Sequence, residues 1–350
     1  WFLKLKLSEI LNLDETKIVN EALPELSNEL IWKLYFELAQ IHERNERLRE
    51  CRKCYAKGVV CCQSNLVWKI WLGGARTELQ HKNYNAARKL LIRAHQEVPE
   101  KMKATVLIEM SRLEEYLGNR DQSRYYLKKA KQFTGHEWKV YLEAVLLEMR
   151  DNNFDLSKSE VEEALQTHPT TGRLWAVKTQ IAHLINTEQR KDTSEQISIF
   201  IEALQNVPKS GEVWCEGARI AISSEEFDKA RSYLEFAILF TPQYGDSFIE
   251  YLRLEILSVP KEERMEALDS PKCDEIERMC INSDPTYGVC WSFCRNHPAE
   301  STRQCFRQAK KFIQFLIEED RDPTLDIATH FAKMRNSDLD EKMRFKLIYN

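Results

Sequence analysis

The stretch AARKLLIRAHQEVP, residues 86–99, contains the pattern that decides the fold. A small residue is followed by an arginine, a second alanine stands seven positions after the first small residue, and a proline stands twelve positions after it. The offset of seven returns along the chain, and most copies also keep the basic residue and the terminating Pro or Gly. The copies begin at Ala87, Ser123, Ser157, Gln196, Ala230 and Thr302. We therefore interpret the opening stretch as one unit of a repeated array.

A second pattern lies between these copies and begins with an aromatic or large apolar anchor. Several anchors stand six residues after a proline, and several are followed by Glu at position +7. The anchors are Trp71, Leu107, Tyr141, Trp175, Trp214, Phe248 and Trp291, and successive anchors are 36, 34, 34, 39, 34 and 43 residues apart. A period of this length with two helical patterns per unit indicates an array of helix-turn-helix repeats.

The two patterns have a simple physical reading. Apolar residues spaced at i, i+3, i+4 and i+7 give each helix one buried stripe. The proline after the second helix ends that helix because it cannot continue the hydrogen-bond ladder. One such unit cannot bury its apolar face alone, so successive units stack on one another. We predict an all-α solenoid, in which each unit has a first helix, helix A, and a second helix, helix B.

The regularity of the pattern changes along the chain and suggests boundaries. A polar, proline-interrupted stretch replaces the expected helix B after the Phe248 anchor. We predict an N-terminal helical region or degenerate repeats over 1–65, the repeat array over 66–257, a polar break or linker over 258–284, and a C-terminal repeat with further helices over 285–350.

Composition narrows the classes of function. The chain has 350 residues, of which 43% are hydrophobic and 30% charged, as in a folded protein. A net charge of −4 argues against the whole chain being an electrostatic binder of nucleic acid, although a local basic face stays possible. No apolar run reaches the roughly 20 residues needed to span a bilayer, so we expect no membrane partner. The chain begins without Met, which suggests a fragment, and its ten irregularly spaced Cys suggest reduced, intracellular thiols.

Motifs for catalysis are missing from the sequence. There is no glycine-rich phosphate loop, no HExxH and no GxSxG. We predict that the chain is not an enzyme, has no catalytic residues, binds no cofactor, and takes no small-molecule substrate.

Two groups of potential metal ligands allow two interpretations. Zinc prefers four such ligands. The spacings match no standard zinc module, however, and Cys on a helix face behaves as a small hydrophobe. The groups are Cys51, Cys54, Cys61 and Cys62, and Cys290, Cys294, His297 and Cys305. We predict core packing and no metal.

Arginine recurs at position +5 from the anchor, and this ladder also has two interpretations. Facing a concave groove, it would bind an acidic peptide or a phosphate, because Arg pairs with such groups bidentately. Alternatively, the arginines pair within their own helix, because Glu109, Glu216 and Glu250 stand three residues before three of them. The four are Arg76, Arg112, Arg219 and Arg253.

A second charge pattern joins the two helices of a unit. Glu at anchor +7 stands ten residues before the basic residue of helix B, as in Glu78 and Arg88. Glu114 with Arg124 and Glu148 with Lys158 repeat this spacing. We predict a structural ion pair between helix A and helix B of the same unit.

The combination of the two patterns resembles the HAT (half-a-TPR) repeat. The resemblance extends over roughly residues 66–315, and it departs from the motif at Ala221, which replaces the helix A Glu, and at Gln196. It implies a right-handed superhelical α-solenoid of HAT/TPR-like repeats. HAT-repeat proteins occur mainly in RNA-processing assemblies, including splicing scaffolds.

We therefore predict a non-catalytic scaffold for protein–protein interactions in a nuclear, splicing-type ribonucleoprotein. Its partners would be other proteins of a large complex, with RNA reached indirectly through them. Two alternatives stay open. One is a cytoskeletal, ciliary or axonemal scaffold built from the same repeats. The other is an RNA-binding or zinc-stabilised module that uses the Cys groups and Lys128, Lys129 and Lys131.

Overall fold

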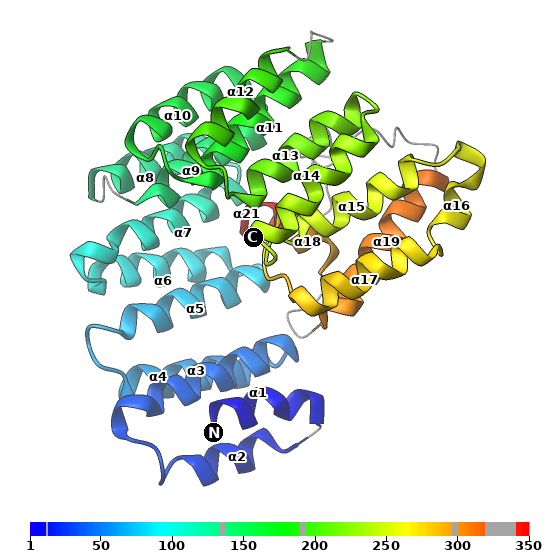
Figure 1. The fold of residues 1–350 in the computed structure, drawn as a ribbon. Helices are drawn as coiled ribbons and strands as arrows, with labels where there is room; N and C mark the ends of the chain where they lie inside the picture. The colour runs from blue at the N-terminus through cyan, green and yellow to red at the C-terminus, as the bar shows by residue number, and fades with distance from the viewer. Residues whose placement is uncertain (12, 134–136, 190–193, 296–299, 319–340, 350) are drawn as a thin grey trace. The chain divides into compact units, whose positions relative to one another are not determined.

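The structure, a computed structural model, describes residues 1–11, 13–133, 137–189, 194–295, 300–318 and 341–349. Apart from one isolated bridge between Tyr244 and Tyr287, the regular structure of these residues is helical (Figure 1). This confirms the predicted all-α repeat solenoid. The chain divides into two compact units, Trp1–Gly135 and His136–Asn350, so this division falls inside the predicted array. No helix within the described ranges is long and apolar enough to cross a membrane.

The first unit is built from helix pairs. Helices α3 and α4, α5 and α6, and α7 and α8 pack closely as pairs, while α4 also packs on α5 and α6 on α7. Helices α4 and α6 therefore each contact the helix A of their own repeat and that of the next. The helices are α1 (Phe2–Leu11), α2 (Glu15–Ala22), α3 (Asn28–Arg44), α4 (Leu48–Cys61), α5 (Val67–Gln80), α6 (Tyr84–Glu97), η1 (Glu100–Met102), α7 (Lys103–Tyr116) and α8 (Arg120–Phe133).

The second unit continues the pairing and then departs from it. It contains α9 (Trp138–Arg150), α10 (Phe154–Thr167), α11 (Gly172–Gln189), α12 (Ser194–Asn206), α13 (Gly211–Ser223), α14 (Phe227–Phe240), α15 (Asp246–Leu257), η2 (Lys261–Glu263), α16 (Arg264–Ala267), α17 (Pro271–Ser283), α18 (Val289–Cys294), α19 (Thr302–Glu318) and α21 (Glu341–Tyr349). Helices η2, α16 and α17 occupy the segment predicted as a polar break. Cys273, Ile276 and Cys280 of α17 are buried in one core with Phe248 and Trp291.

The small residues of the repeat lie where helices approach closely. The alanine seven positions into each copy is fully buried in all six cases, with 0% of its surface exposed: Ala94, Ala130, Ala164, Ala203, Ala237 and Ala309. A larger side chain at these positions would push the two packed helices apart, because protein interiors are close-packed. The spacing of seven residues between the first small residue and the alanine therefore marks the same helix-packing contact in each repeat.

A residue in the left-handed backbone conformation, with positive φ, follows helix A in five of the repeats. The residues are Glu46, Lys82, Gly118, Asn152 and Glu225, all with φ between 55° and 83°. The next residue then donates its backbone N–H to the carbonyl five positions earlier, as Asn83 does to Glu78 at 2.8 Å. This geometry satisfies the last carbonyls of a helix and turns the chain into helix B. Four of the five residues are not glycine, so composition gives little sign of the turn.

The anchors all lie in helix A of their repeats, and most are buried. Leu107 and Phe248 have 0% of their surface exposed, whereas Trp71 and Trp214 are half-buried. The spacing of six from Pro to Trp has a direct cause. The indole N–H of Trp175 donates to the carbonyl of Pro169 at 2.7 Å, and that of Trp214 donates to the carbonyl of Pro208 at 2.8 Å.

The Phe248→Ala substitution tests this packing. We expect it to lower the free energy of unfolding by about 3–5 kcal/mol, because it leaves a cavity in a fully buried site. Phe236→Ala is the matched control, because Phe236 is 41% exposed, and we expect a loss below about 1 kcal/mol. Urea unfolding followed by circular dichroism measures both, and equal losses would contradict the assigned repeat register.

Candidate protein-interaction site

A buried glutamate joins successive repeats in the first unit. Glu78 of α5 accepts two hydrogen bonds from Arg52 of α4, both at 2.7 Å, and one from the side chain of Asn83 at 2.9 Å. Arg52 belongs to helix B of the preceding repeat, and Asn83 belongs to the turn after α5. The carboxylate therefore fixes its own turn and the neighbouring repeat together.

The next repeat copies this arrangement. Glu114 of α7 accepts from Nε and Nη2 of Arg88 at 2.8 and 2.9 Å, and from Asn119 at 2.8 Å. In the second unit, Glu255 of α15 accepts from Arg231 of α14 at 2.9 Å and from Lys272 of α17 at 3.2 Å. We call these three sets of contacts the inter-repeat ion pairs.

The predicted ion pair within one unit is wrong. Arg88 pairs with Glu114 of the next repeat and not with Glu78, which stands ten residues before it. Glu114 is bound by Arg88 and Asn119 and not by Arg124, while Lys158 pairs with Glu195 and not with Glu148. In the Arg88 case, helix B also packs on the following helix A, and this second contact brings the arginine to the next glutamate.

These contacts change the acidity of the buried carboxyl groups. Hydrogen bonds from Arg52 lower the pKa of Glu78 below its ordinary value, and this effect outweighs the opposing effect of burial. Burial alone would raise the pKa of Glu114, but the hydrogen bonds from Arg88 and Asn119 together lower it. Both glutamates are therefore held in the ionised form.

The structure places the four predicted groove arginines in two different settings. Arg76 is exposed, and its Nε lies 3.0 Å from Glu109 of the next repeat. Arg112 is half-buried, with Nη1 at 3.3 Å from the same Glu109. A ligand in this part of the first unit would therefore compete with Glu109 for both guanidinium groups.

Arg219 and Arg253 are buried, with 2% and 3% of their surfaces exposed. Arg219 pairs with Glu216, and its Nε lies 3.2 Å from Glu250. Nε of Arg253 donates to Glu250 at 2.7 Å. The three intrahelical pairs expected from the sequence are present. The two that lie in this unit form a buried network rather than an accessible ladder.

Asp246 extends this network to the C-terminal helices and was not identified from the sequence. Its carboxylate accepts the backbone N–H groups of Val289 at 3.0 Å and Trp291 at 2.8 Å, so it caps α18. Gly288 has φ of 145°, and a Cβ there would lie 2.2 Å from Asp246 Oδ1. The close approach requires glycine. Asp246 therefore holds α18 beside the start of α15.

The described cysteines are mostly core residues. Burial raises the pKa of Cys51 to about 12, and it raises the pKa of Cys305 to about 12, which leaves both thiols protonated. Within the ranges that the structure describes, no three His, Cys, Asp or Glu side chains are grouped as metal ligands. His297 lies outside those ranges, so the second predicted group is described only in part.

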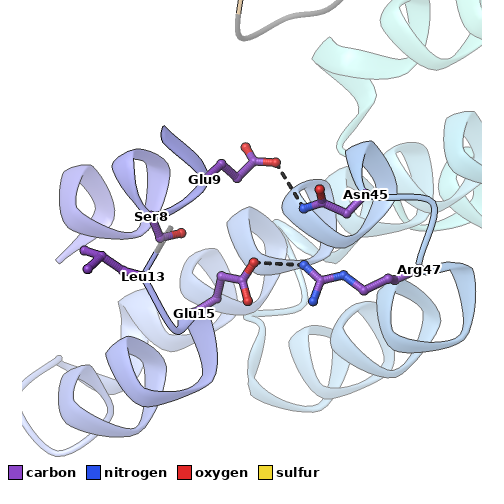
Figure 2. Close-up of a pocket in the computed structure, with 6 residues that line it drawn as sticks. All are labelled: Ser8, Glu9, Leu13, Glu15, Asn45 and Arg47. Atoms are coloured by element: carbon purple, nitrogen blue, oxygen red, sulfur yellow. Dashed lines mark hydrogen bonds and ion pairs between the residues drawn. The ribbon is translucent and has the colours of Figure 1, made fainter. Parts of the chain in front are cut away.

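A polar pocket of about 380 Å³ lies among α1, α2 and the turn between α3 and α4 (Figure 2). Glu9 accepts from Asn45 at 3.2 Å, and Glu15 accepts from Arg47 at 2.8 Å. Ser8 and Leu13 complete the lining. Glu9 also pairs with Arg44 of α3, so the ion pairs of Glu9 and Glu15 hold α1 and α2 against the end of α3 and the turn after it.

A partly exposed aromatic surface on α13 and α14 is the strongest candidate for protein contact. Phe236 packs against Trp214 with ring centroids 4.9 Å apart and stacks on Phe240 at 6.2 Å. Leu239, on the same helix, is 69% exposed. We define the aromatic patch as Trp214, Phe236, Leu239 and Phe240. Large exposed apolar groups gathered in this way mark interaction surfaces.

The inter-repeat ion pair of Arg88 and Glu114 is tested by a double-mutant cycle. We expect a coupling of about 1–2 kcal/mol between Arg88→Met and Glu114→Gln, because the carboxylate is buried although the guanidinium is partly exposed. Glu226 and Lys229 form an exposed pair at the start of α14, with side chains 51% and 47% exposed, and serve as the control, with an expected coupling of about 0.2–0.5 kcal/mol. Equal couplings in urea unfolding would contradict the structural role of Glu114.

Acid provides an independent test of the same carboxyl groups. A carboxyl group with a lowered pKa in the folded state stabilises the fold above its unfolded pKa, and this stabilisation is lost as pH falls through the folded value. We expect the free energy of unfolding of Glu114→Gln to fall less than that of the parent chain between about pH 5 and pH 3. Only the parent has an ionised Glu114 carboxylate to lose as the pH falls through this range. Glu100→Gln, at an exposed carboxylate, should track the parent, and identical profiles for all three would refute the assignment.

Comparison with known proteins places these features in a family. Residues 1–310 match the family model described as PRP6, TPR-like domain. The chain is 49% identical over 319 residues to a TPR-containing protein of Dictyostelium discoideum, an alignment that covers 89% of this chain and 23% of that protein. The chain therefore spans less than two thirds of the relative's length.

Solved structures with similar folds are more distant. A tetratricopeptide repeat protein from Parabacteroides merdae is 15% identical with a TM-score of 0.43, covering 73% of this chain and 90% of that chain. A signal-transduction ATPase with a tetratricopeptide repeat sensor from Pyrococcus horikoshii is 16% identical with a TM-score of 0.44, covering 86% and 50%. On the family match over most of its length, the chain belongs to the PRP6 TPR-like domain family.

Proposed function

We propose that this chain is a non-catalytic scaffold that holds proteins together in a nuclear, splicing-type ribonucleoprotein. Its TPR-like repeats form a scaffold for protein interactions, and the proposal concerns the assembly that this scaffold serves. Family membership over residues 1–310 supports an RNA-processing assembly, in line with the HAT-like motifs of the sequence. A splicing role would place the protein in the nucleus.

The aromatic patch is the observation that carries the scaffold role. Phe236 is 41% exposed and Leu239 is 69% exposed, although the repeat itself needs neither side chain for its buried core. Burial of such groups against a partner removes apolar surface from water and would stabilise a complex. Trp214, held by its hydrogen bond to Pro208, offers a rigid ring beside them. We expect the patch to receive apolar side chains of a partner protein.

Affinity purification of the full-length tagged protein from its native cells, followed by mass spectrometry, tests this function. We expect RNA-processing proteins to be enriched, both before and after treatment with ribonuclease, because protein contacts hold the assembly. Enrichment of tubulin or axonemal proteins instead would contradict the nuclear assignment and favour a cytoskeletal scaffold.

A paired variant tests the aromatic patch itself. We expect Phe236→Asp with Leu239→Asp to reduce recovery of at least one partner about tenfold, as for loss of an interface hot spot. Leu3→Asp with Leu11→Asp adds the same charge at side chains that are 69% and 58% exposed, and it should leave recovery unchanged. Full recovery with the patch variant would show that partners bind elsewhere.

A further inference from the structure

Positive charge gathers on helix B in the first unit. Helices α4, α6 and α8 together carry twelve Lys and Arg and only three Asp and Glu, a net charge of +9. The whole chain carries −4. We define the basic face as the Lys and Arg side chains of these three helices.

The repeat architecture does not require this charge. The corresponding helices of the second unit, α10, α12 and α14, carry three Lys and Arg and eight Asp and Glu, a net charge of −5. These helices form the same pairwise packing with their helix A partners. The basic face is therefore a property of the first unit and needs an explanation other than folding.

Part of the basic face has no internal counter-charge. Arg52 and Arg88 are bound to buried glutamates in the inter-repeat ion pairs. Six others form no ion pair within the described part of the chain: Arg49, Lys53, Lys57, Lys89, Lys128 and Lys129. Like charges held close together repel one another, so their concentration is costly unless an anion binds them.

Helices α6 and α8 both pack on α7, and Glu114 of α7 joins them: it accepts from Arg88 of α6 at 2.8 Å and from Asn119, the residue before α8, at 2.8 Å. Burial lowers the pKa of His95 on α6, and the nearby charge of Lys129 on α8 lowers it further. The phenol of Tyr126 on α8 in turn acts on Arg88 of α6. The cations of α6 and α8 therefore lie on two helices that pack on the same helix, α7. Figure 1 shows α7 between them.

Aromatic rings stand among these cations. Tyr125 is 54% exposed, and its ring centroid lies 5.6 Å from that of Tyr126. On α8, Tyr125 stands three residues before Lys128, and Tyr126 stands three residues before Lys129. Cations interleaved with exposed aromatic rings match single-stranded nucleic acid, in which phosphates pair with cations and unpaired bases stack on rings. An acidic peptide would use the cations but has no base to place on Tyr125.

We propose that the basic face binds single-stranded RNA directly, with lysines of α4, α6 and α8 on the phosphates and Tyr125 stacked on a base. This goes beyond the proposed scaffold function, in which RNA is reached only through partner proteins. It also does not depend on that function, because the face belongs to one unit of this chain.

The test uses the purified chain with a fluorescently labelled single-stranded oligouridine, and measures anisotropy over a series of salt concentrations. The variant replaces Lys53, Lys89, Lys128 and Lys129 with Glu. We expect its affinity for the oligouridine to fall about tenfold. The slope of log K against log salt should become shallower by about 3, because each of the lost phosphate contacts contributes about 0.7 to that slope. The corresponding Lys→Gln variant should show a smaller loss in the same direction if the Glu variant folds poorly.

A charge-matched control separates the face from net charge. Replacing Lys17, Lys139, Lys209 and Lys311 with Glu changes the net charge equally at exposed sites outside α4, α6 and α8. We expect this control to keep most of the affinity. Absence of RNA binding by the parent chain, or equal loss in control and variant, would overturn the proposal.

Tyr125→Ala distinguishes RNA from an acidic protein. We expect it to weaken oligouridine binding about tenfold, as for the loss of one stacked base, and to leave binding of labelled polyglutamate unchanged. Polyglutamate binding as tight as oligouridine binding, with no effect of Tyr125→Ala on either, would assign the face to an acidic protein partner instead and overturn the RNA assignment.

Discussion

The arrangement of the repeats depends on a buried carboxylate at the end of helix A. Glu114 is 4% exposed and accepts hydrogen bonds both from Arg88 of the preceding repeat and from Asn119 of its own turn. A carboxylate in this position cannot stay ionised without these donors, because burial of an unpaired charge is very costly. One side chain thus fixes the length of helix A, the turn after it and the register of the neighbouring repeat. The same residue types return at Glu78, which explains why the period stays close to 34–36 residues in this part of the chain.

Much of the fold could be predicted from the sequence because its signals are local. The alanine seven positions into each copy and the anchors mark helix-packing contacts that recur at fixed offsets, and the alanines are all fully buried. The partners of the charged residues could not be predicted in this way. A spacing of ten suggested Glu78 with Arg88, but the pairing depends on which helix packs next to which. The turns could not be predicted either, because the residues with left-handed backbone conformations, such as Lys82 and Glu225, are not glycines.

The candidate site was less predictable than the fold. Four arginines at one offset look equivalent in the sequence, yet Arg76 is exposed whereas Arg219 is buried among carboxylates. The difference arises because Asp246 and Glu250 of the second unit contact the Arg219 guanidinium, which is buried there. The aromatic patch was hidden for a different reason. Phe236 and Leu239 continue the apolar pattern of α14, so only the structure shows that they lie outside the core. One repeat framework therefore carries different surfaces: a basic face in the first unit and an aromatic patch in the second.

Native-state hydrogen exchange of the Arg88→Met variant tests the role of the inter-repeat ion pairs most directly. Loss of the guanidinium leaves Glu114 buried with two hydrogen bonds fewer, so the local free energy of opening should fall where α6 meets α7. We predict that amide protection decreases in α7 and in the turn at Asn119, while α13 and α14 of the second unit keep the protection of the parent chain. Unchanged protection in α7, or a uniform decrease along the whole chain, would contradict the claim that this buried carboxylate sets the register between repeats.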